Sequence, residues 1–286
     1  MKNNITDSFS KYIAYKEAEI SNSSYSNYQK TLIHLTDFLK DRKYQEWSEP
    51  MLDDFKKFLL RKRLLPSTIN TDIVLIKGYL RYSKKKLTFT KVPDLKEKDS
   101  VYLNEDEIDR LKNVPLNETH TNVLKIFLIQ YYTGQRISDV MNLNINQVKN
   151  GYWNLLNKKT HKRLTIPLVG YSGKALEYME YFSYKIPQFT ISTMNVYLKN
   201  ICKLAGIDEE IEVNKLINGE LVTTYVPKYK LIGTHTARRS CITNLINKGV
   251  PLNVIRKLTG HSDIATLMVY DKTGVNELSK HLERID

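Results

Sequence analysis

The segment TNVLKIFLIQYYTG, residues 121–134, constrains this chain more than any other stretch, because apolar residues lie on nearly every side of the helix it would form. A helix that is apolar all round must be covered on all sides by other elements. Gly134 follows the apolar run, and glycine is the residue type that most often ends a helix. We therefore expect a central, buried helix ending at Gly134. The 286 residues are enough for two modest domains, each with its own core.

Residues 6–82 have a different organisation, with apolar residues at helical spacing throughout. Ser, Asp or Pro residues stand where the expected helices begin, as is typical of helix caps and first turns. The pattern predicts four helices, over residues 7–19, 21–42, 50–63 and 66–86. Because the connections between them are short and polar, we expect a small bundle of antiparallel helices.

The stretch 84–100 breaks this pattern, because it is charged, contains Pro93 and lacks helical periodicity. We place the interdomain linker in it, and assign residues 1–90 to the first domain, 91–100 to the linker and 101–286 to the second domain. Lysines 84–86 stand at its start. They either face solvent or contact phosphates.

The second domain combines helices with short strands. Strand-like runs at 152–156 and 163–168 flank a polar turn that carries Lys158, Lys159 and Lys162. A second hairpin is expected within 210–233, where Asn218-Gly219 is a strong turn signal. The predicted fold class is therefore mainly α with a small β component (α+β). It consists of an N-terminal helical bundle and a C-terminal domain of helices and β-hairpins.

The charge of the chain indicates its partner. Forty-four Lys and Arg against 31 Asp and Glu give a formal charge of +13, which favours a polyanion, most often nucleic acid. Against a membrane partner, the sequence has no run of 18 apolar residues, no terminal basic amphipathic helix and no signal peptide. Cys202 and Cys241 fit neither a disulfide framework nor a zinc site, so we expect an intracellular protein in a reducing cytoplasm.

Two places in the second domain carry cations where a helix begins or ends. In a helix starting near Thr234, His235 and Arg238 project from the same side of the first turn. The free amides of that turn already favour an anion, so the added cations are poor for stability but suited to gripping a phosphate. Arg136 follows the stop at Gly134, and Asp139 could reach back to it, either as a helix-end salt bridge or as part of a functional site.

Taken together, these positions resemble the tyrosine recombinase, or phage integrase, family. The resemblance rests on five motifs in one order: Thr133-Gly134-Gln135-Arg136-Ile137-Ser138-Asp139, a hairpin lysine before Thr160, His235-Thr236-Ala237-Arg238, Thr259-Gly260-His261-Ser262, and Tyr270. Each motif alone is weak, and their combined order is specific. The motifs span roughly residues 100–286, and the N-terminal bundle resembles the family's core-binding domain. Small departures are Arg239, where many relatives have His, and Leu258-Thr259-Gly260 before His261.

The resemblance implies a reaction that needs no metal, ATP or other cofactor. Tyr270 would attack the scissile phosphate and form a 3′-phosphotyrosyl link, releasing a 5′ hydroxyl. Arg136 and Arg238 would hold the non-bridging oxygens, since a guanidinium fork matches two oxygens and stays charged.

The resemblance also implies roles in proton transfer and positioning. Lys159, with Lys158 as its close competitor, would be the general acid to the 5′ oxygen. His235 would assist proton transfer with the tyrosine, and His261 would hydrogen-bond the phosphate. Asp139 would orient the first of the two arginines and could also orient His235.

The partner that the resemblance implies is double-stranded DNA with inverted-repeat core sites. The chain would be a monomer in solution and a homo-tetramer on DNA, in the bacterial cytoplasm at the nucleoid, with an accessory DNA-bending protein as a further partner. Apolar spacing over 275–285 predicts a C-terminal helix that docks on a neighbouring protomer or packs within its own. A type IB topoisomerase-like enzyme, and a DNA-binding accessory protein or regulator that has lost recombination, remain alternatives.

Overall fold

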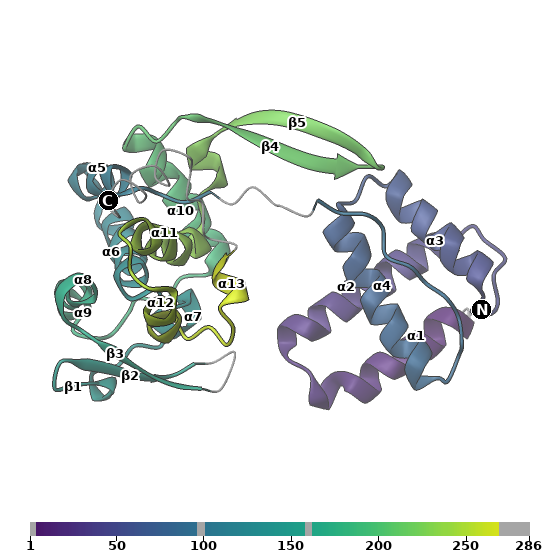
Figure 1. Ribbon diagram of the computed structural model, residues 1–286. Helices are drawn as coiled ribbons and strands as arrows, with labels where there is room; N and C mark the ends of the chain where they lie inside the picture. Colours follow the sequence, from purple (N-terminus) through teal and green to yellow (C-terminus); the bar gives the residue numbers. More distant parts are fainter. Residues whose placement is uncertain (1–3, 96–100, 158–161, 269–286) are drawn as a thin grey trace, which may run out of the picture. The chain divides into compact units, whose positions relative to one another are not determined.

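The computed structural model describes residues 4–95, 101–157 and 162–268 (Figure 1). Its internal contacts divide the chain into two compact units, Met1–Asp99 with Glu212–Thr224, and Ser100–Ile211 with Tyr225–Asp286. Helices make up most of the described residues and the strands are few, which confirms the mainly α class with a small β component.

The first unit contains the four expected helices: α1 (Asn4–Lys16), α2 (Asn22–Leu39), α3 (Glu49–Arg61) and α4 (Pro66–Tyr82), with a short 3-10 turn, η1 (Glu17–Glu19). The Ser21 and Ser48 hydroxyls accept backbone amides of the first turns of α2 and α3, as the sequence predicts for caps. Helix α4 ends four residues earlier than expected. Lys84 has a left-handed backbone (φ 56°), and the Lys85 amide bonds to the Leu80 carbonyl, which closes the helix.

The beginning of the expected linker packs on this bundle. Phe89 and Val92 are 2% and 9% exposed and belong to the core of the first unit. Asn70 of α4 makes two hydrogen bonds to the backbone of Val92, and the Glu49 carboxylate accepts the Thr88 amide. Residues 87–95 therefore form a strap across the bundle, and the first residues of the expected 91–100 linker pack on the first unit. Two isolated apolar residues in an irregular segment carry no periodicity that could reveal this packing.

The second unit is built around α6 (Glu118–Thr133), the central helix expected from the sequence. Its residues 123, 124 and 126–133 are all buried, and it ends at Gly134 in a left-handed conformation (φ 66°). Helices α9 (Ala175–Tyr181), α10 (Ile191–Leu204) and α11 (Thr234–Asn247) pack against it. The remaining helical elements are α5 (Glu105–Asn113), α7 (Ile137–Val140), η2 (Ile145–Gln147), α8 (Gly170–Gly173), η3 (Lys228–Leu231), α12 (Leu252–Thr259) and α13 (Ala265–Met268).

Two small antiparallel sheets complete the fold. Strands β1 (Val148–Lys149), β2 (Tyr152–Leu156) and β3 (Arg163–Pro167) form one sheet, in which Trp153 pairs with Ile166 and both side chains are fully buried. Strands β4 (Glu210–Ile217) and β5 (Glu220–Pro227) form a hairpin. Its two-residue turn is Asn218-Gly219, both with positive φ, as expected for this pair.

Candidate active site

The loop after α6 positions the first candidate arginine. Gln135, fully buried, donates from Nε2 to the Thr133 carbonyl and to the Leu258 carbonyl of α12, so this loop is fastened to a helix far away in sequence. Arg136 follows as the N-cap residue of α7. Its Nη1 is buried and has no hydrogen-bond partner among the described residues. A buried guanidinium nitrogen with a spare donor is suited to receive an anionic oxygen.

Helix α11 carries the second candidate arginine in its first turns. The Asn195 side chain accepts the Thr234 amide, which fixes where the helix begins. Arg238 is only 1% exposed, and its Nη1 donates to the Gly134 carbonyl at 2.7 Å. His235, three residues earlier, is exposed. The two residues expected on one side of the first turn therefore differ in exposure: Arg238 is buried inside the domain, and His235 lies at its surface.

His261 follows the end of α12, where Gly260 takes a left-handed conformation (φ 69°). A Cβ at Gly260 would lie 2.5 Å from Leu164 Cδ1 of β3, so a larger residue there would also force the Leu164 side chain to move. The His261 ring lies 3.0 Å (Nε2) from Arg238 Nη2 and 2.6 Å (Nδ1) from the Thr259 hydroxyl. This arrangement joins the end of α12 to α11.

Four of the predicted residues share one electrostatic environment. Burial first, and then the charges of Arg238, Arg136 and His235, lower the pKa of His261 to about 4. Positive charges close to a histidine lower its pKa, because they disfavour the protonated ring. The structure therefore brings these two arginines and two histidines together as one cationic site.

Asp139 lies beside this site but makes a contact that the sequence did not predict. It is buried, and its Oδ2 accepts a hydrogen bond from Asn157 Nδ2 at 3.0 Å. Because Arg136 Nη1 has no partner in the described part of the chain, the expected contact from Asp139 does not reach that nitrogen. Asn157, fully buried at the end of β2, donates its amide to the Lys162 carbonyl across the hairpin. Through Asn157, Asp139 thus holds the hairpin at the point where β2 ends.

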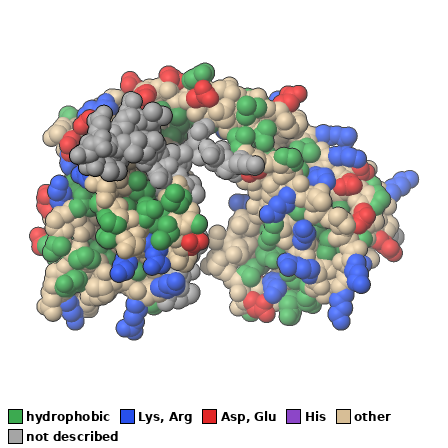
Figure 2. All heavy atoms as spheres, viewed as in Figure 1, with side chains coloured by type: hydrophobic (Ala, Val, Ile, Leu, Met, Phe, Trp, Pro, Cys, Tyr) green, Lys and Arg blue, Asp and Glu red, His purple; other side chains and the backbone are tan. Residues whose placement is uncertain are grey.

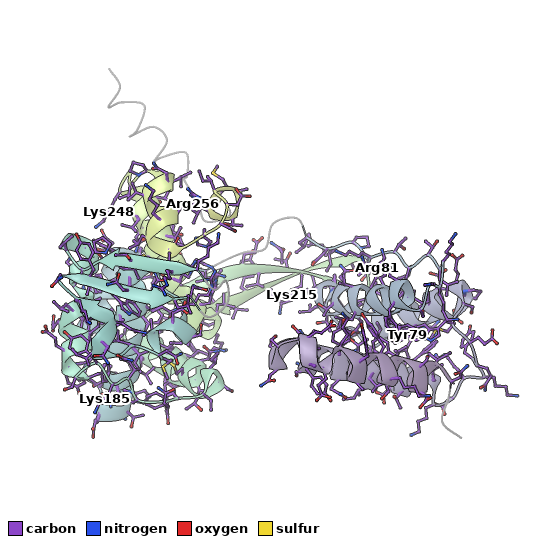
Figure 3. The ribbon with its side chains drawn as sticks, turned by 90° about the horizontal axis from the view of Figure 1, so that it is seen from below. Tyr79, Arg81, Lys185, Lys215, Lys248 and Arg256 are labelled. Carbon is purple, nitrogen blue, oxygen red and sulfur yellow. The ribbon has the colours of Figure 1, made fainter. Side chains whose placement is uncertain are left out.

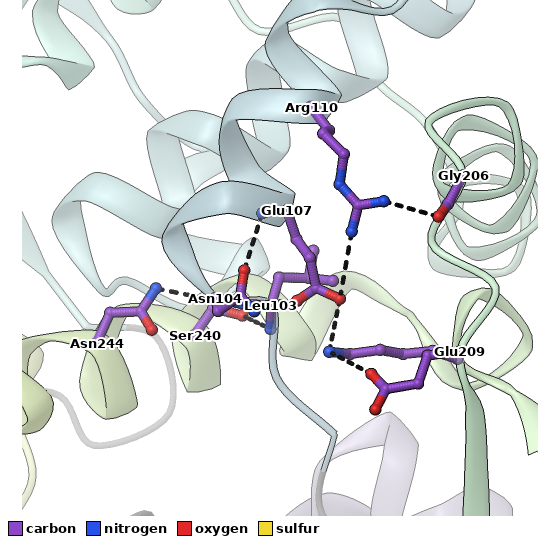
Figure 4. A network of polar contacts seen from close by, with 9 residues as sticks. Leu103, Asn104, Glu107, Arg110, Gly206, Glu209, Ser240 and Asn244 are labelled. Carbon is purple, nitrogen blue, oxygen red and sulfur yellow. Dashed lines mark hydrogen bonds and ion pairs between the residues drawn. The ribbon is translucent and has the colours of Figure 1, made fainter. Parts of the chain in front are cut away.

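A second polar network holds α11 from the other side (Figure 4). The Ser240 hydroxyl accepts the Leu103 amide, and Asn244 donates to the Leu103 carbonyl. Next to this strand-like segment, Glu107 of α5 accepts the Asn104 amide and pairs with buried Lys228 at 2.6 Å. These contacts fasten α11 to the segment before α5, and they tie α5 to η3, which leads into α11.

Three predicted site residues lie outside the described residues: Lys158, Lys159 and Tyr270. The expected C-terminal helix over 275–285 lies outside them as well. Three further residues contact the site residues or the segments that carry them: Gln135, Asn157 and Thr259. Gln135 and Thr259 lie within two of the family motifs, and Asn157 directly precedes Lys158. Their position next to motif residues is therefore the sequence feature that could have indicated a place in the site.

Among the described residues, no group of side chains is a candidate metal site, and neither cysteine is a candidate reactive thiol. No three His, Cys, Asp or Glu side chains there are grouped as metal ligands would be. Cys202 and Cys241 are free and buried, and burial raises the pKa of each thiol to about 12. No helix among the described residues is long and apolar enough to span a membrane.

The fold and the site define a class of protein: a mainly helical, two-unit chain with a cationic site suited to hold a phosphate. Known proteins agree with this class, since the Phage integrase family matches residues 101–276 and the Phage integrase SAM-like domain matches residues 4–97. The chain belongs to the phage integrase family of tyrosine recombinases, which cleave and rejoin DNA strands in site-specific recombination. Membership of this family favours site-specific recombination over the topoisomerase-like and non-catalytic alternatives.

The similarity extends over most of the chain. Tyrosine recombinase XerC of Herpetosiphon aurantiacus is 24% identical over 286 residues, covering 91% of this chain and 88% of the relative. Tyrosine recombinase XerA of Pyrococcus horikoshii is 24% identical over 270 residues, covering 89% of this chain and 87% of the relative.

Solved structures share the fold. XerH recombinase bound to difH substrate superposes with a TM-score of 0.68 at 16% identity, covering 99% of this chain and 96% of the other. A lambda integrase tetramer bound to a Holliday junction gives a TM-score of 0.71 at 14% identity, covering 93% and 76%. These neighbours have the N-terminal helical domain and C-terminal catalytic domain that the sequence predicts for this chain.

Proposed function

We propose that this recombinase cleaves DNA by attack of Tyr270 on a scissile phosphate, which forms a 3′-phosphotyrosyl link and releases a 5′ hydroxyl. Arg136 and Arg238 hold the two non-bridging oxygens as negative charge builds up on the phosphate. One observation carries this proposal. Arg136 and Arg238 come from distant parts of the sequence, yet both act on the pKa of His261, and Arg238 is already fixed by the Gly134 carbonyl.

The proton needed by the leaving 5′ oxygen comes from Lys159 in this proposal, with Lys158 as the competing candidate. The hydrogen bond between Asp139 and Asn157 supports a lysine in this stretch, because it fastens the residue just before Lys158 to the arginine-bearing loop. Asp139 therefore has a positioning role. His235, exposed at the start of α11, assists proton transfer with the tyrosine, and His261 hydrogen-bonds the phosphate.

Residues 1–90 are proposed to form the core-binding DNA domain, 91–100 the linker, and 101–286 the catalytic domain with a C-terminal helix exchanged between protomers.

In the first unit, a cavity of about 310 Å³ has no acidic residue in its lining. Four cations line it: Lys77, Arg81, Lys85 and Lys91. None of the four has an ion pair with an acidic residue that the structure describes.

This cationic cavity is a candidate contact for DNA phosphates. Figure 2 shows Lys and Arg side chains spread over the visible face of the helical unit. In Figure 3, Arg81 lies on the outer side of α4, whereas Tyr79 faces the bundle core. Unpaired cations gathered around one cavity repel one another, and a bound phosphate chain relieves that repulsion. Lys85 is one of the three lysines whose role the sequence left open.

The proposed assembly is a homo-tetramer on double-stranded DNA with inverted-repeat core sites, formed from monomers and assisted by a DNA-bending protein. It is supported by the lambda integrase structure, a tetramer bound to a Holliday junction. We also propose that it acts in the bacterial cytoplasm, at the nucleoid; bacterial relatives such as the XerC of Herpetosiphon aurantiacus and the XerD of Oceanobacillus iheyensis support a bacterial protein.

Covalent trapping tests the proposed chemistry. Wild type and Tyr270→Phe are incubated with sheared DNA of the source organism, denatured, and examined for protein-linked fragments whose ends are sequenced. We expect an adduct with wild type and none with Tyr270→Phe, whereas Tyr225→Phe, which alters an exposed tyrosine of β5, retains it. Adducts that persist in Tyr270→Phe, or that are absent from wild type despite salt-sensitive DNA binding, would contradict the proposal.

A further inference from the structure

The hydroxyl of Thr259 makes two short contacts at the end of α12. It lies 2.7 Å from the Ile255 carbonyl and 2.6 Å from His261 Nδ1. A carbonyl can only accept, so the single hydroxyl proton is directed to Ile255. The Thr259 oxygen must then accept from His261, which means that Nδ1 carries the proton.

Arg238 does not select between the two tautomers. Its Nη2 lies 3.0 Å from His261 Nε2 and 3.3 Å from Nδ1, close to both ring nitrogens. The assignment therefore rests on the Thr259 hydroxyl, and with Nδ1 protonated the neutral ring has its lone pair on Nε2.

The surroundings of His261 keep the ring neutral in the free protein. Among the described residues, the charged and titratable groups that act on its pKa are Arg238 and His235 of α11 and Arg136 before α7, and all three lower it. Burial lowers the pKa further, to about 4. At neutral pH, His261 is therefore an uncharged ring with a proton on Nδ1 and none on Nε2.

This state conflicts with phosphate binding. When Arg238 Nη2 turns to a phosphate oxygen, the Nε2 lone pair is left facing negative charge. A proton on Nε2 would convert that repulsion into a charge-assisted hydrogen bond. Because the Thr259 oxygen keeps Nδ1 protonated, the proton cannot move from one ring nitrogen to the other, and it must come from solvent.

We propose that Thr259 is a positioning residue that holds His261 in the Nδ1–H tautomer, so that His261 binds a phosphate only together with one added proton. The proton coupling rests on the proposed phosphate-binding role of His261, whereas the tautomer does not. The Thr259 oxygen also stabilises the resulting imidazolium, because it accepts from Nδ1–H in both states.

The coupling gives phosphate binding a pH dependence of defined sign. A bound phosphate raises the pKa of His261 above its free value of about 4. The added affinity is greatest at low pH and is lost as pH rises through the pKa of the bound state. Within that window, uptake of one proton changes affinity by up to about tenfold per pH unit.

Nitrogen NMR of the full chain with isotopically labelled histidine measures the tautomer directly, with His261 assigned by its loss in His261→Asn. Free wild type and Thr259→Ser should show protonated Nδ1 and bare Nε2. Thr259→Val removes the acceptor, so a second tautomer should appear. Thr133→Val is the matched control, because the Thr133 hydroxyl donates to its own i−4 carbonyl, Ile129, and precedes Gly134, as Thr259 does before Gly260.

Titration with dimethyl phosphate, a phosphodiester that does not titrate near neutral pH, tests the proton coupling. Both ring nitrogens of wild type should become protonated on binding, with affinity rising as pH falls, and Thr259→Val should lose most of this pH dependence. A bare Nδ1 in free wild type, or an unchanged tautomer in Thr259→Val, would overturn the positioning role. Binding without proton uptake, or no binding, would overturn the coupling. A failure of covalent trapping would leave the tautomer result intact, so the two proposals fail separately.

Discussion

At the scale of single residues, the site depends on an arginine that is fixed before any ligand arrives. Arg238 is almost completely buried, and one nitrogen of its fork is held by the Gly134 carbonyl while another faces His261. Such a side chain has already lost its rotamer freedom, so little further entropy is lost when it grips a phosphate.

Arg238→Lys should therefore reduce the rate of DNA cleavage by about 10²–10³-fold, the range found when one donor to a transition-state oxygen is lost. A single ammonium cannot bond the Gly134 carbonyl and a phosphate oxygen in the same geometry. Single-turnover cleavage of the trapped target site measures the effect. Arg239→Lys is the matched control, since Arg239 donates to the Val101 carbonyl and should change the rate only severalfold. Equal rates for Arg238→Lys and wild type would contradict this role.

At the scale of elements, the site is made where helices begin and end. The left-handed glycine that ends α6 precedes Arg136, the one that ends α12 precedes His261, and α11 brings Arg238 between them. A Cβ added to Gly134 would lie 2.8 Å from Thr259 Cγ2, so the two helix ends touch. The network of Leu103, Glu107 and Lys228 then fastens α11 and the chain leading to it.

Glu107→Gln should destabilise the chain by about 3 kcal/mol, because it leaves Lys228 charged and buried while retaining an oxygen for the Asn104 amide. Urea unfolding measures the loss. The double variant Glu107→Gln/Lys228→Met should recover much of it, since both charges are removed. For comparison, Lys248→Met breaks an exposed pair with Glu105 and should cost about 0–1 kcal/mol. Equal losses for the buried and exposed pairs would refute the interpretation.

At the scale of the whole molecule, both units carry an excess of positive charge, and exposed lysines such as Lys11, Lys57 and Lys62 already face a carboxylate. The cationic cavity of the first unit is different, because its lysines and arginine lack such partners among the described residues. Lysines of this kind are the ones expected to release counterions when DNA binds.

Replacing Lys77, Arg81 and Lys85 together by Gln should weaken binding to duplex DNA of any sequence. The slope of log affinity against log salt should fall by about two to three, roughly one for each lost phosphate contact. Fluorescence anisotropy at several salt concentrations measures the slope.

The matched control for this triple variant removes three ion-paired lysines of the same unit, Lys11, Lys57 and Lys62. Because it changes the net charge by the same amount, a similar fall in slope would mean that overall charge, rather than the cavity, governs binding.

The sequence by itself determined the elements and the kind of site. Helix periods, caps and turn signals involve residues a few positions apart, so the four bundle helices, the buried α6 and the Asn218-Gly219 turn could be predicted. The order of the motifs identified the family, and with it the residues expected in the site.

Only the tertiary structure decided how these residues meet. The contact of Arg238 with the Gly134 carbonyl spans 104 residues, and that of Gln135 with Leu258 spans 123. Asp139 accepts a hydrogen bond from Asn157 of the hairpin, and Val92 of the expected linker enters the core of the first unit. Local patterns cannot specify such pairs, because each depends on which distant element is packed alongside. The proton on His261 has the same origin, since it is placed by a helix end and an arginine that only packing brings together.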